Sequence, residues 1–251
     1  MTLLSLSIAA LAGSFFGLLL GGFSKGALGL GLPLIAVPIL SMFMPIPQAL
    51  AILTVPVFLT NIWQAMQGGN LGAVIKRFWP MTIALVIGIG LGTQLLVRLD
   101  QKTLYLIMGT VVLIQPAVRL LKPNFVLSLS AQRWVGPGMA AGGGLLGGVS
   151  GFYGPPLMVY LAMLKLPKDL FTATIAMLFF VGGLSLAIFL AQLDVMNQSN
   201  LILSTAALIP AVLGIFIGPK IRARISQKQF ERAITVAMLL IGLSLLSKGF
   251  A

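Results

Sequence analysis

Lys25 is the first charged residue of the chain, and it lies between Ser24 and Gly26 among long apolar runs. A charge at membrane depth marks a substrate or ion path by default. Glycine lets the backbone approach a bound anion closely, and the N–H groups at a helix start favour negative charge. This set, which continues to Gly29 and Gly31, therefore predicts anion contacts. The alternative is that Lys25 only sets the orientation of the chain in the membrane.

A second polar set lies in the apolar run 48–67. Thr60, Asn61 and Gln64 are spaced i, i+1 and i+4, which places them on one face of a helix. Their amides and hydroxyls are suited to binding sulfur or carboxylate oxygens. The alternatives are hydrogen bonds between helices, or anchoring of Trp63 and Gln64 at the membrane interface.

A glycine-rich cluster at 142–154 supplies the third set of candidates, which are Ser150, Gly151, Tyr153 and Gly154. Residues 148–151 also read as GxSG, a pattern found around the serine of rhomboid-type intramembrane proteases. Such a serine needs a base, and the chain contains no histidine. It contains no cysteine either, so the usual zinc and haem ligands are missing. We therefore expect no enzyme, no catalytic residue, no cofactor and no metal site.

The elements that position these residues must lie in lipid. Of the 251 residues, 59% are apolar and only 8% are charged, against about 25% charged in an ordinary soluble domain. The apolar runs are continuous rather than alternating, which excludes a β-barrel. The composition predicts an all-α integral membrane protein. The net charge of +12 then indicates cytoplasmic loops rather than a nucleic-acid partner.

Ten apolar runs follow one another, and we interpret them as a single polytopic domain over residues 1–251. They cover residues 3–20, 27–44, 48–67, 79–97, 103–121, 134–149, 154–164, 170–190, 200–218 and 233–247. The run 3–20 lacks the basic start of a signal peptide, so we expect it to be retained. Runs 134–149 and 154–164 are short, and 27–44 contains two prolines. These three predict broken or re-entrant helices, which need not cross the membrane fully.

The chain also repeats itself. Residues 21–24, 31–34 and 46–48 are answered in the same order by residues 147–150, 154–157 and 166–168. This predicts two related halves, about 1–122 and 133–251. An odd number of segments per half inverts the second half if every segment crosses. The inverted arrangement places twelve basic residues inside and three outside, whereas a parallel repeat places nine inside and six outside. We therefore expect inverted repeats with both termini outside.

The combination of residues 21–33, Pro47 to Leu50, Thr60 to Gln64 and 142–157 resembles the sulfite exporter TauE/SafE family of bacterial permeases. The resemblance extends over essentially the whole chain in length, hydropathy and duplication. It implies transport of small anions across the bacterial inner membrane, with sulfite, sulfonates and small carboxylates as the substrate class. Family members are usually described with about eight spans.

Inverted halves with broken helices are typical of secondary transporters that work by alternating access. We therefore expect a permease whose partners are a small anion and the lipid bilayer. The four acidic residues lie in or beside predicted loops, so no carboxylate relay for protons is visible. A proton or sodium coupling ion and a homodimer stay open. The alternative from another class is a membrane-integral accessory protein that helps a partner to assemble and carries no flux itself.

Overall fold

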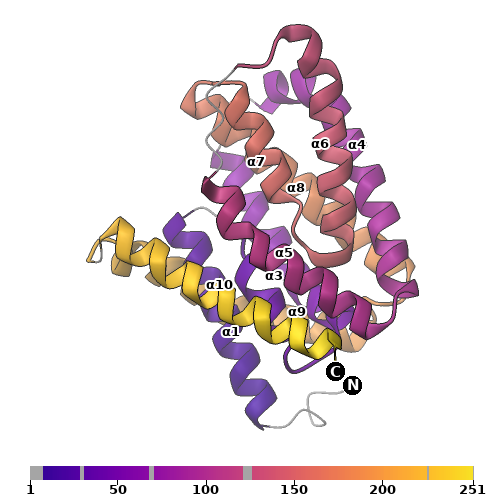
Figure 1. Ribbon diagram of the computed structural model, residues 1–251, viewed down its shortest axis with the longest axis vertical. Coiled ribbons are helices and arrows are strands. Elements are labelled where there is room, and N and C mark those ends of the chain that lie inside the picture. Colours follow the sequence, from indigo (N-terminus) through magenta and orange to yellow (C-terminus); the bar gives the residue numbers. More distant parts are fainter. Residues whose placement is uncertain (1–7, 29–30, 68–70, 121–125, 225, 251) are drawn as a thin grey trace. The chain divides into compact units, whose positions relative to one another are not determined.

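The computed structural model describes residues 8–28, 31–67, 71–120, 126–224 and 226–250 (Figure 1). All elements in these ranges are α-helices. The helices are α1 (Ile8–Leu28), α2 (Pro33–Leu40), α3 (Ile46–Gln67), α4 (Leu71–Arg98), α5 (Gln101–Leu120), α6 (Leu129–Ser150), α7 (Gly154–Met163), α8 (Lys168–Gln192), α9 (Gln198–Arg222) and α10 (Gln227–Phe250). The prediction of an all-α membrane protein is confirmed.

Six of the described helices are long and apolar enough to cross a membrane, judged by length and composition. They are α1, α3, α4, α8, α9 and α10. Helices α2 and α7 have only 8 and 10 residues, as expected for broken segments, and each begins with proline at its first or second position. Proline suits a helix start because its fixed φ is helical and its missing N–H has no helical partner there.

Two boundaries differ from the prediction. Helix α6 has 22 residues rather than being short, because Leu129 to Arg133 extend it beyond the apolar run that the composition defines. Helix α1 continues to Leu28, so that Lys25 lies in its last turn and not in the connection that follows it. The glycines at 142–148 lie within α6, and the interruption is confined to residues 151–153.

The described helices form two compact units, and each unit combines helices from both halves of the sequence. Unit 1 comprises residues 1–57, 99–116 and 191–251, and unit 2 comprises residues 58–98 and 117–190. Helix α3 passes from unit 1 to unit 2 after Val57, and α5 does so after Pro116. The remaining crossings lie at or near the ends of α4 and α8.

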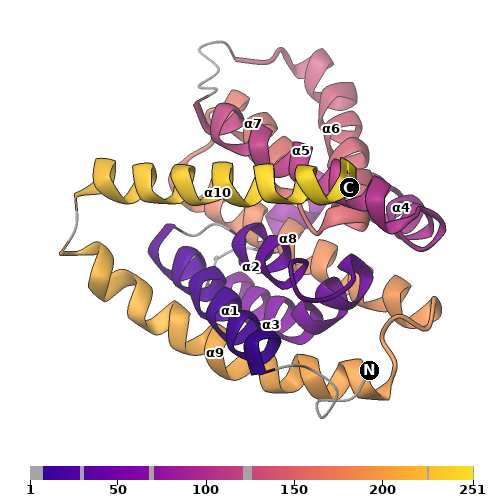
Figure 2. The same cartoon turned by 60° about the horizontal axis from the view of Figure 1, so that its bottom comes forward.

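In unit 1, α1 packs along α9 with backbone against backbone (Figure 2). The close contacts are those of Gly22 with Ala211, Gly26 with Ile215, Gly214 with Leu19 and Gly218 with Phe23. A Cβ atom on any of these glycines would overlap a backbone carbonyl oxygen of the other helix. The paired residues are 189 or 195 positions apart in the chain, and within each of these two rows both numbers rise by four, so α1 and α9 run parallel. Small residues give this kind of close approach between membrane helices.

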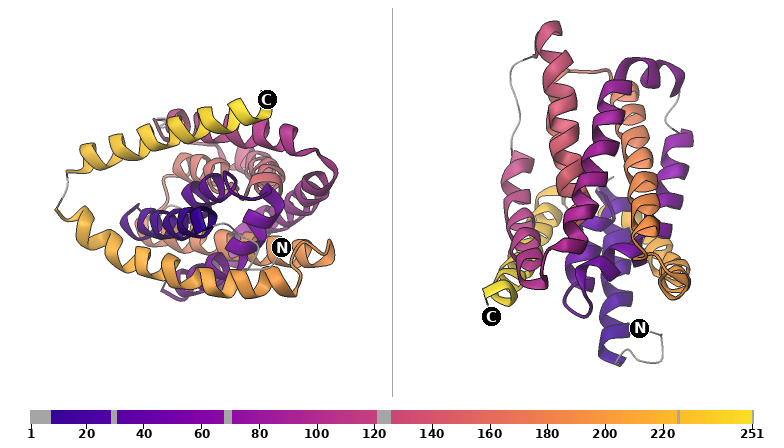
Figure 3. Two further views of the ribbon diagram at one scale, coloured as in Figure 1. Left: turned by 90° about the horizontal axis from the view of Figure 1, so that it is seen from below. Right: turned by 90° about the vertical axis from the view of Figure 1, so that its right-hand side faces the viewer.

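In unit 2, α4 and α6 repeat the same arrangement, and the two helices lie side by side in both views (Figures 1 and 3). Their close contacts are those of Gly88 with Ala141, Gly92 with Leu145, Gly144 with Leu85 and Gly148 with Ile89. This pair is also parallel. Gly144 and Gly148 of α6 are therefore packing residues against α4, whereas a Cβ at Gly138 or Gly142 would have no neighbour within 4 Å.

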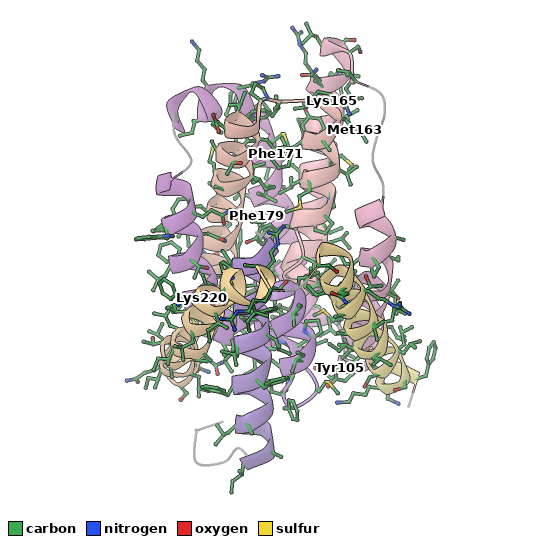
Figure 4. All side chains as sticks on the ribbon, turned by 90° about the vertical axis from the view of Figure 1, so that its left-hand side faces the viewer. Tyr105, Met163, Lys165, Phe171, Phe179 and Lys220 are labelled. Carbon is green, nitrogen blue, oxygen red and sulfur yellow. The ribbon has the colours of Figure 1, made fainter. Side chains whose placement is uncertain are left out.

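Helices α5 and α10 pack together in unit 1, and they run antiparallel. Gly109 contacts Leu246, Gly242 contacts Leu113, and Gly249 contacts Leu106, so one number falls as the other rises. At the end of this pair, the Lys248 ammonium lies 5.6 Å from the centre of the Tyr105 ring. Tyr105 is labelled in Figure 4, and its hydroxyl donates to Ser41 O at 3.2 Å.

Candidate functional site

The last turn of α1 holds a buried cation beside a buried hydroxyl. Lys25 is 8% exposed and Ser24 is fully buried. Ser24 Oγ has no hydrogen-bond partner among the described residues. A buried hydroxyl without a partner is costly. This turn therefore presents an amine and a hydroxyl together, which is the donor set that an anion requires.

The sequence ends α1 here because glycine and proline follow. Pro33 begins α2, and Leu34 N donates to Gly31 O at 3.1 Å in the tight connection between the helices. A Cβ at Gly31 would meet only the Pro33 ring, at 3.5 Å, so this position is not crowded. Gly26 instead packs against the α9 backbone at Ile215. Gly29, the remaining candidate of this set, lies outside the described residues.

Arg222 from the last turn of α9 completes the end of α1. Its Nη1 donates a hydrogen bond to Ala27 O, one of the last carbonyl groups of α1. A cation at this end of a helix is favoured by the helix dipole, and its N–H groups satisfy carbonyls that have no helical partner. Arg222 therefore joins the ends of the two parallel helices, two residues beyond Lys25.

The break between α6 and α7 in unit 2 is built differently. Ser150 is fully buried, but its Oγ donates to Leu146 O at 2.6 Å and accepts from Phe152 N at 3.3 Å. Gly151 has φ 80° and caps α6, with its N–H bonded to Gly147 O at 2.7 Å. This left-handed conformation requires glycine. The polar groups at this break are thus satisfied within the chain.

Tyr153 occupies the interior of unit 2 beside this break. Its hydroxyl donates to Phe179 O at 3.2 Å, and Asn61 Nδ2 donates to the same oxygen at 3.0 Å. The Tyr153 and Phe179 rings meet edge to face, with centres 5.6 Å apart; Phe179 is labelled on α8 in Figure 4. A Cβ at Gly154 would approach the Phe179 ring at 2.9 Å. Helices α3, α7 and α8 are joined at this one carbonyl oxygen.

Thr60 and Gln64, the other polar residues of α3 in unit 2, are half-buried. Asn61 between them is 3% exposed and bonds to α8, whereas Trp63 is 68% exposed. The predicted polar face is therefore divided, because Asn61 bonds within the protein while Thr60 and Gln64 lie nearer the surface of the unit.

The structure brings the candidates together in two separate groups. Ser24, Lys25 and Gly26 are neighbours on α1 in unit 1, while Asn61, Tyr153 and Gly154 gather around Phe179 in unit 2. Sequence reasoning missed the Phe179 carbonyl, since a backbone oxygen carries no signal in residue type. It also missed the bond of Arg222 to Ala27 O, because a basic residue beside an apolar run predicts only a loop on the cytoplasmic side. Its place in the last turn of a helix was the available signal.

No group of three or more His, Cys, Asp or Glu side chains is placed to hold a metal ion within the ranges that the structure describes. Among known families, the model of the sulfite exporter TauE/SafE family matches residues 3–245. No curated protein and no solved structure matches the chain.

Proposed function

The chain belongs to the sulfite exporter TauE/SafE family, and from this premise we propose that it is a secondary transporter for small organic or sulfur oxyanions. Membership makes it a multi-pass membrane protein of the permease type. We propose sulfite, sulfonates and small carboxylates as the substrate class and the bacterial inner membrane as its location. A transporter for anions also fits a site that offers hydrogen-bond donors and a cation.

The buried pair Ser24 and Lys25 is the observation that carries the proposal. Both side chains lie in an apolar helix whose spanning stretch runs from Ile8 to Ala27. An anion at this turn would accept from Ser24 Oγ and offset the charge of Lys25. A cation in the last turn also suits the helix dipole, so the experiment must separate binding from helix stabilisation.

Unit 2 has polar side chains of its own that are suited to substrate contacts. We propose this role for Thr60 and Gln64, which are half-buried on the same helix face. Asn61, Ser150 and Tyr153 bond to backbone carbonyls of their own unit, and we assign them to holding that unit together. Gly151 and Gly154 allow the chain to turn closely beside Tyr153.

Two prolines support alternating access. Pro56 lies within α3 and Pro116 within α5, and each stands within two residues of the point where its helix passes from one unit to the other. Proline removes a helical hydrogen bond and bends a helix. Near Pro56, Val55 N donates to Ser204 Oγ of α9 at 2.9 Å. We propose that the two units move as bodies, with hinges at these prolines.

The antiparallel packing of α5 with α10 supports the inverted repeat, because these are the fifth segments of the two halves. The basic residues agree with it. Helices α1 and α9 end in basic residues, whereas α6 carries Arg133 near its start and α4 carries two basic residues near its start and one, Arg98, at its end. If basic ends face the cytoplasm, the two parallel pairs cross the membrane in opposite directions. We therefore retain the orientation with both termini outside.

Transport by the purified protein in liposomes tests the proposal. A panel of sulfite, sulfonates and small carboxylates is measured by uptake and counterflow, with and without pH and sodium gradients. We expect saturable flux of at least one anion above empty liposomes. The gradients identify the coupling ion if there is one.

Lys25→Arg and Lys25→Ala are the matched variants. Arginine keeps the charge that suits the helix end, but its fork replaces the compact ammonium, whereas alanine removes the charge. Loss of affinity in both variants with retained thermal stability assigns Lys25 to binding. Wild-type affinity and rate in both would return Lys25 to a topology role, and absence of flux for the whole panel would favour the accessory-protein alternative.

A further inference from the structure

The register of α4 and α6 places two exposed tryptophans at the same level along the two helices. The close contacts join residues of the two helices that are 53 or 59 positions apart in the chain. Trp79 on α4 and Trp134 on α6 are 55 positions apart, so the parallel helices carry them at the same level. They are 56% and 82% exposed. Exposed tryptophans at one level are typical of the membrane–water interface, where one side of the ring is wet and the other is apolar.

Basic side chains accompany both tryptophans. Lys76 and Arg77 precede Trp79 by less than one helical turn, Arg133 directly precedes Trp134, and all three are exposed. Arginine binds phosphate with two parallel N–H groups, and lysine adds a compact charge. Each cation near an anionic membrane surface strengthens attachment by about fivefold.

The turn between α7 and α8 lies at this same end of unit 2. Tyr160 OH donates to Gln132 O at 3.2 Å, and Leu127 N donates to Met163 O at 3.3 Å. These bonds place the end of α7 beside the start of α6, and Lys165, labelled with Met163 in Figure 4, is exposed in the turn. Among the described acidic residues, only Asp169 belongs to this unit. The described charge at this end is therefore predominantly positive.

Beyond the tryptophans, α4 presents an apolar face that continues along the helix. Every fourth residue is apolar and at least 41% exposed; these residues are Ile75, Trp79, Ile83, Ile87, Leu91 and Leu95. Each step of four residues turns about 40° around the helix, so neighbouring members such as Trp79, Ile83 and Ile87 share one side of α4. A lipid with its headgroup at the basic residues would find an apolar surface for its acyl chains directly below.

We propose that this end of unit 2 binds an anionic phospholipid. Lys76, Arg77 and Arg133 hold the headgroup phosphate, Trp79 and Trp134 lie at the level of the glycerol backbone, and the apolar face of α4 contacts the acyl chains. The site is distinct from the substrate site proposed on α1 and does not depend on it.

The basic end of unit 1 shows that positive charge alone does not make this arrangement. Lys220, Arg222 and Arg224 also lie at a helix end, and Lys220 is labelled in Figure 4. The chain has three tryptophans, Trp63, Trp79 and Trp134, and all of them belong to unit 2. Charge that served only to set orientation would need no aromatic partners at the same level.

Native mass spectrometry of the full chain, with phosphatidylglycerol and phosphatidylcholine as probes, tests the proposal. The variant is Arg77→Gln with Arg133→Gln, and the matched control is Arg98→Gln with Lys102→Gln, which removes the same charge from exposed positions elsewhere. We expect wild type and control to retain phosphatidylglycerol in preference to phosphatidylcholine. We expect the variant to bind phosphatidylglycerol roughly 25-fold more weakly, from two cations at about fivefold each.

A second variant, Trp79→Leu with Trp134→Leu, keeps the surface apolar, and we expect it to weaken phosphatidylglycerol binding while the protein stays folded. Equal retention of phosphatidylglycerol by wild type and the double arginine variant would overturn the proposal, as would an equal loss in the control. Soluble glycerol phosphate serves as the third probe. Displacement of the lipid by glycerol phosphate at concentrations similar to those of the lipid would show a site for soluble anions and would also overturn the proposal.

Discussion

The breaks that follow α1 and α6 are surrounded by similar helix packing, but their polar side chains are bonded differently. In each unit a glycine-rich helix packs against a parallel partner and ends, and a short helix that starts with proline follows. At the break in unit 2, Ser150 and Tyr153 bond to backbone carbonyls. At the break in unit 1, Ser24 is buried without a hydrogen-bond partner among the described residues, and the neighbouring Lys25 carries a charge.

From this difference we infer that one break recognises the substrate and that the other stabilises the fold. Polar groups that are satisfied by the protein stabilise a fold, whereas a buried donor that the protein leaves unsatisfied is costly unless a ligand uses it. We therefore assign substrate charge recognition to the end of α1 and a framework role to the α6–α7 break. The comparison makes separate predictions for stability and for transport.

We expect the largest effect, a loss of stability, from substitutions at the glycines of the α1–α9 and α4–α6 contacts. In Gly148→Ala the new Cβ would lie 2.5 Å from Ile89 O, and in Gly22→Ala it would overlap Ala211 O. Backbone atoms cannot move aside cheaply, so we expect each variant to lose folded protein or to lower the apparent Tm by about 10 °C or more. Thermal unfolding in detergent measures this.

Gly142→Ala is the control for the glycine variants, because an added Cβ there has no neighbour within 4 Å. Alanine favours a helix over glycine by about 1 kcal/mol, so this variant should be as stable as wild type or slightly more stable. A large loss of stability in Gly142→Ala, or none in Gly148→Ala, would contradict the close-packing interpretation of these glycines.

We expect the next largest effect, a loss of substrate affinity, on removing the charge of Lys25 from the break in unit 1. Lys25→Ala should weaken substrate affinity by about 100-fold, as expected when a buried charge partner of an anion is removed. Counterflow in liposomes over a range of substrate concentrations measures the affinity. If Lys25→Ala transports like wild type, the break in unit 1 has no special role in recognition.

The hinge prolines test whether the units move as bodies. Pro56→Ala restores an N–H group to α3 near its crossing between the units. We expect the transport rate to fall several-fold while substrate affinity stays unchanged, because a straighter and stiffer helix resists bending. Pro80→Ala, within α4 and in the middle of the unit 2 segment 58–98, is the matched control. Equal effects of the two variants on rate would argue against a hinge at Pro56.

A matched pair of hydroxyl deletions separates recognition from framework. Tyr153→Phe removes a buried hydrogen bond to Phe179 O, which should cost about 1–3 kcal/mol of stability and leave substrate affinity unchanged. Ser24→Ala removes a hydroxyl without a described partner, so stability should hold while affinity falls by about tenfold. The reverse outcome, with Ser24→Ala unstable and Tyr153→Phe weak in binding, would exchange the roles of the two breaks.

Much of this fold was predictable because composition and hydropathy act along the chain. The apolar runs at 48–67 and 170–190 correspond to α3 and α8, and the prolines indicated the short helices. The length of α6 was missed because Gln132 and Arg133 interrupt its hydropathy without interrupting its backbone bonds. Hydropathy indicates whether a segment lies in lipid or in water. The length of a helix depends instead on backbone hydrogen bonds, which polar residues also make.

The contacts of the individual glycines were also beyond the sequence. Identical letters align Gly22 with Gly148, but the packing contacts pair Gly22 with Ala211 in the way that Gly144 pairs with Leu85. The residues with similar contacts therefore differ from the residues with matching letters by one helical turn. Several glycines spaced by three or four offer the same match at more than one offset, and only the partner helix decides between them. The same holds for Asn61, whose residue type fitted both a ligand contact and the bond to Phe179 O that it makes.

We expect the smallest effect in the pH dependence of Tm, and the residue responsible lies outside both breaks. Asp100 begins α5, where its carboxylate accepts hydrogen bonds from Thr103 N at 3.0 Å and Thr103 Oγ1 at 2.6 Å. These bonds lower the pKa of Asp100 below its usual value. The stabilisation is therefore complete above the unfolded pKa and is lost as pH falls through the lower folded value. Neither break contains a carboxylate among its described residues, so Asp100→Asn should reduce the fall in Tm between neutral and acid pH while transport at neutral pH stays as in wild type. An unchanged pH profile of Tm in this variant would show that the cap contributes nothing measurable, and a change in substrate affinity would connect this turn to the site on α1 after all.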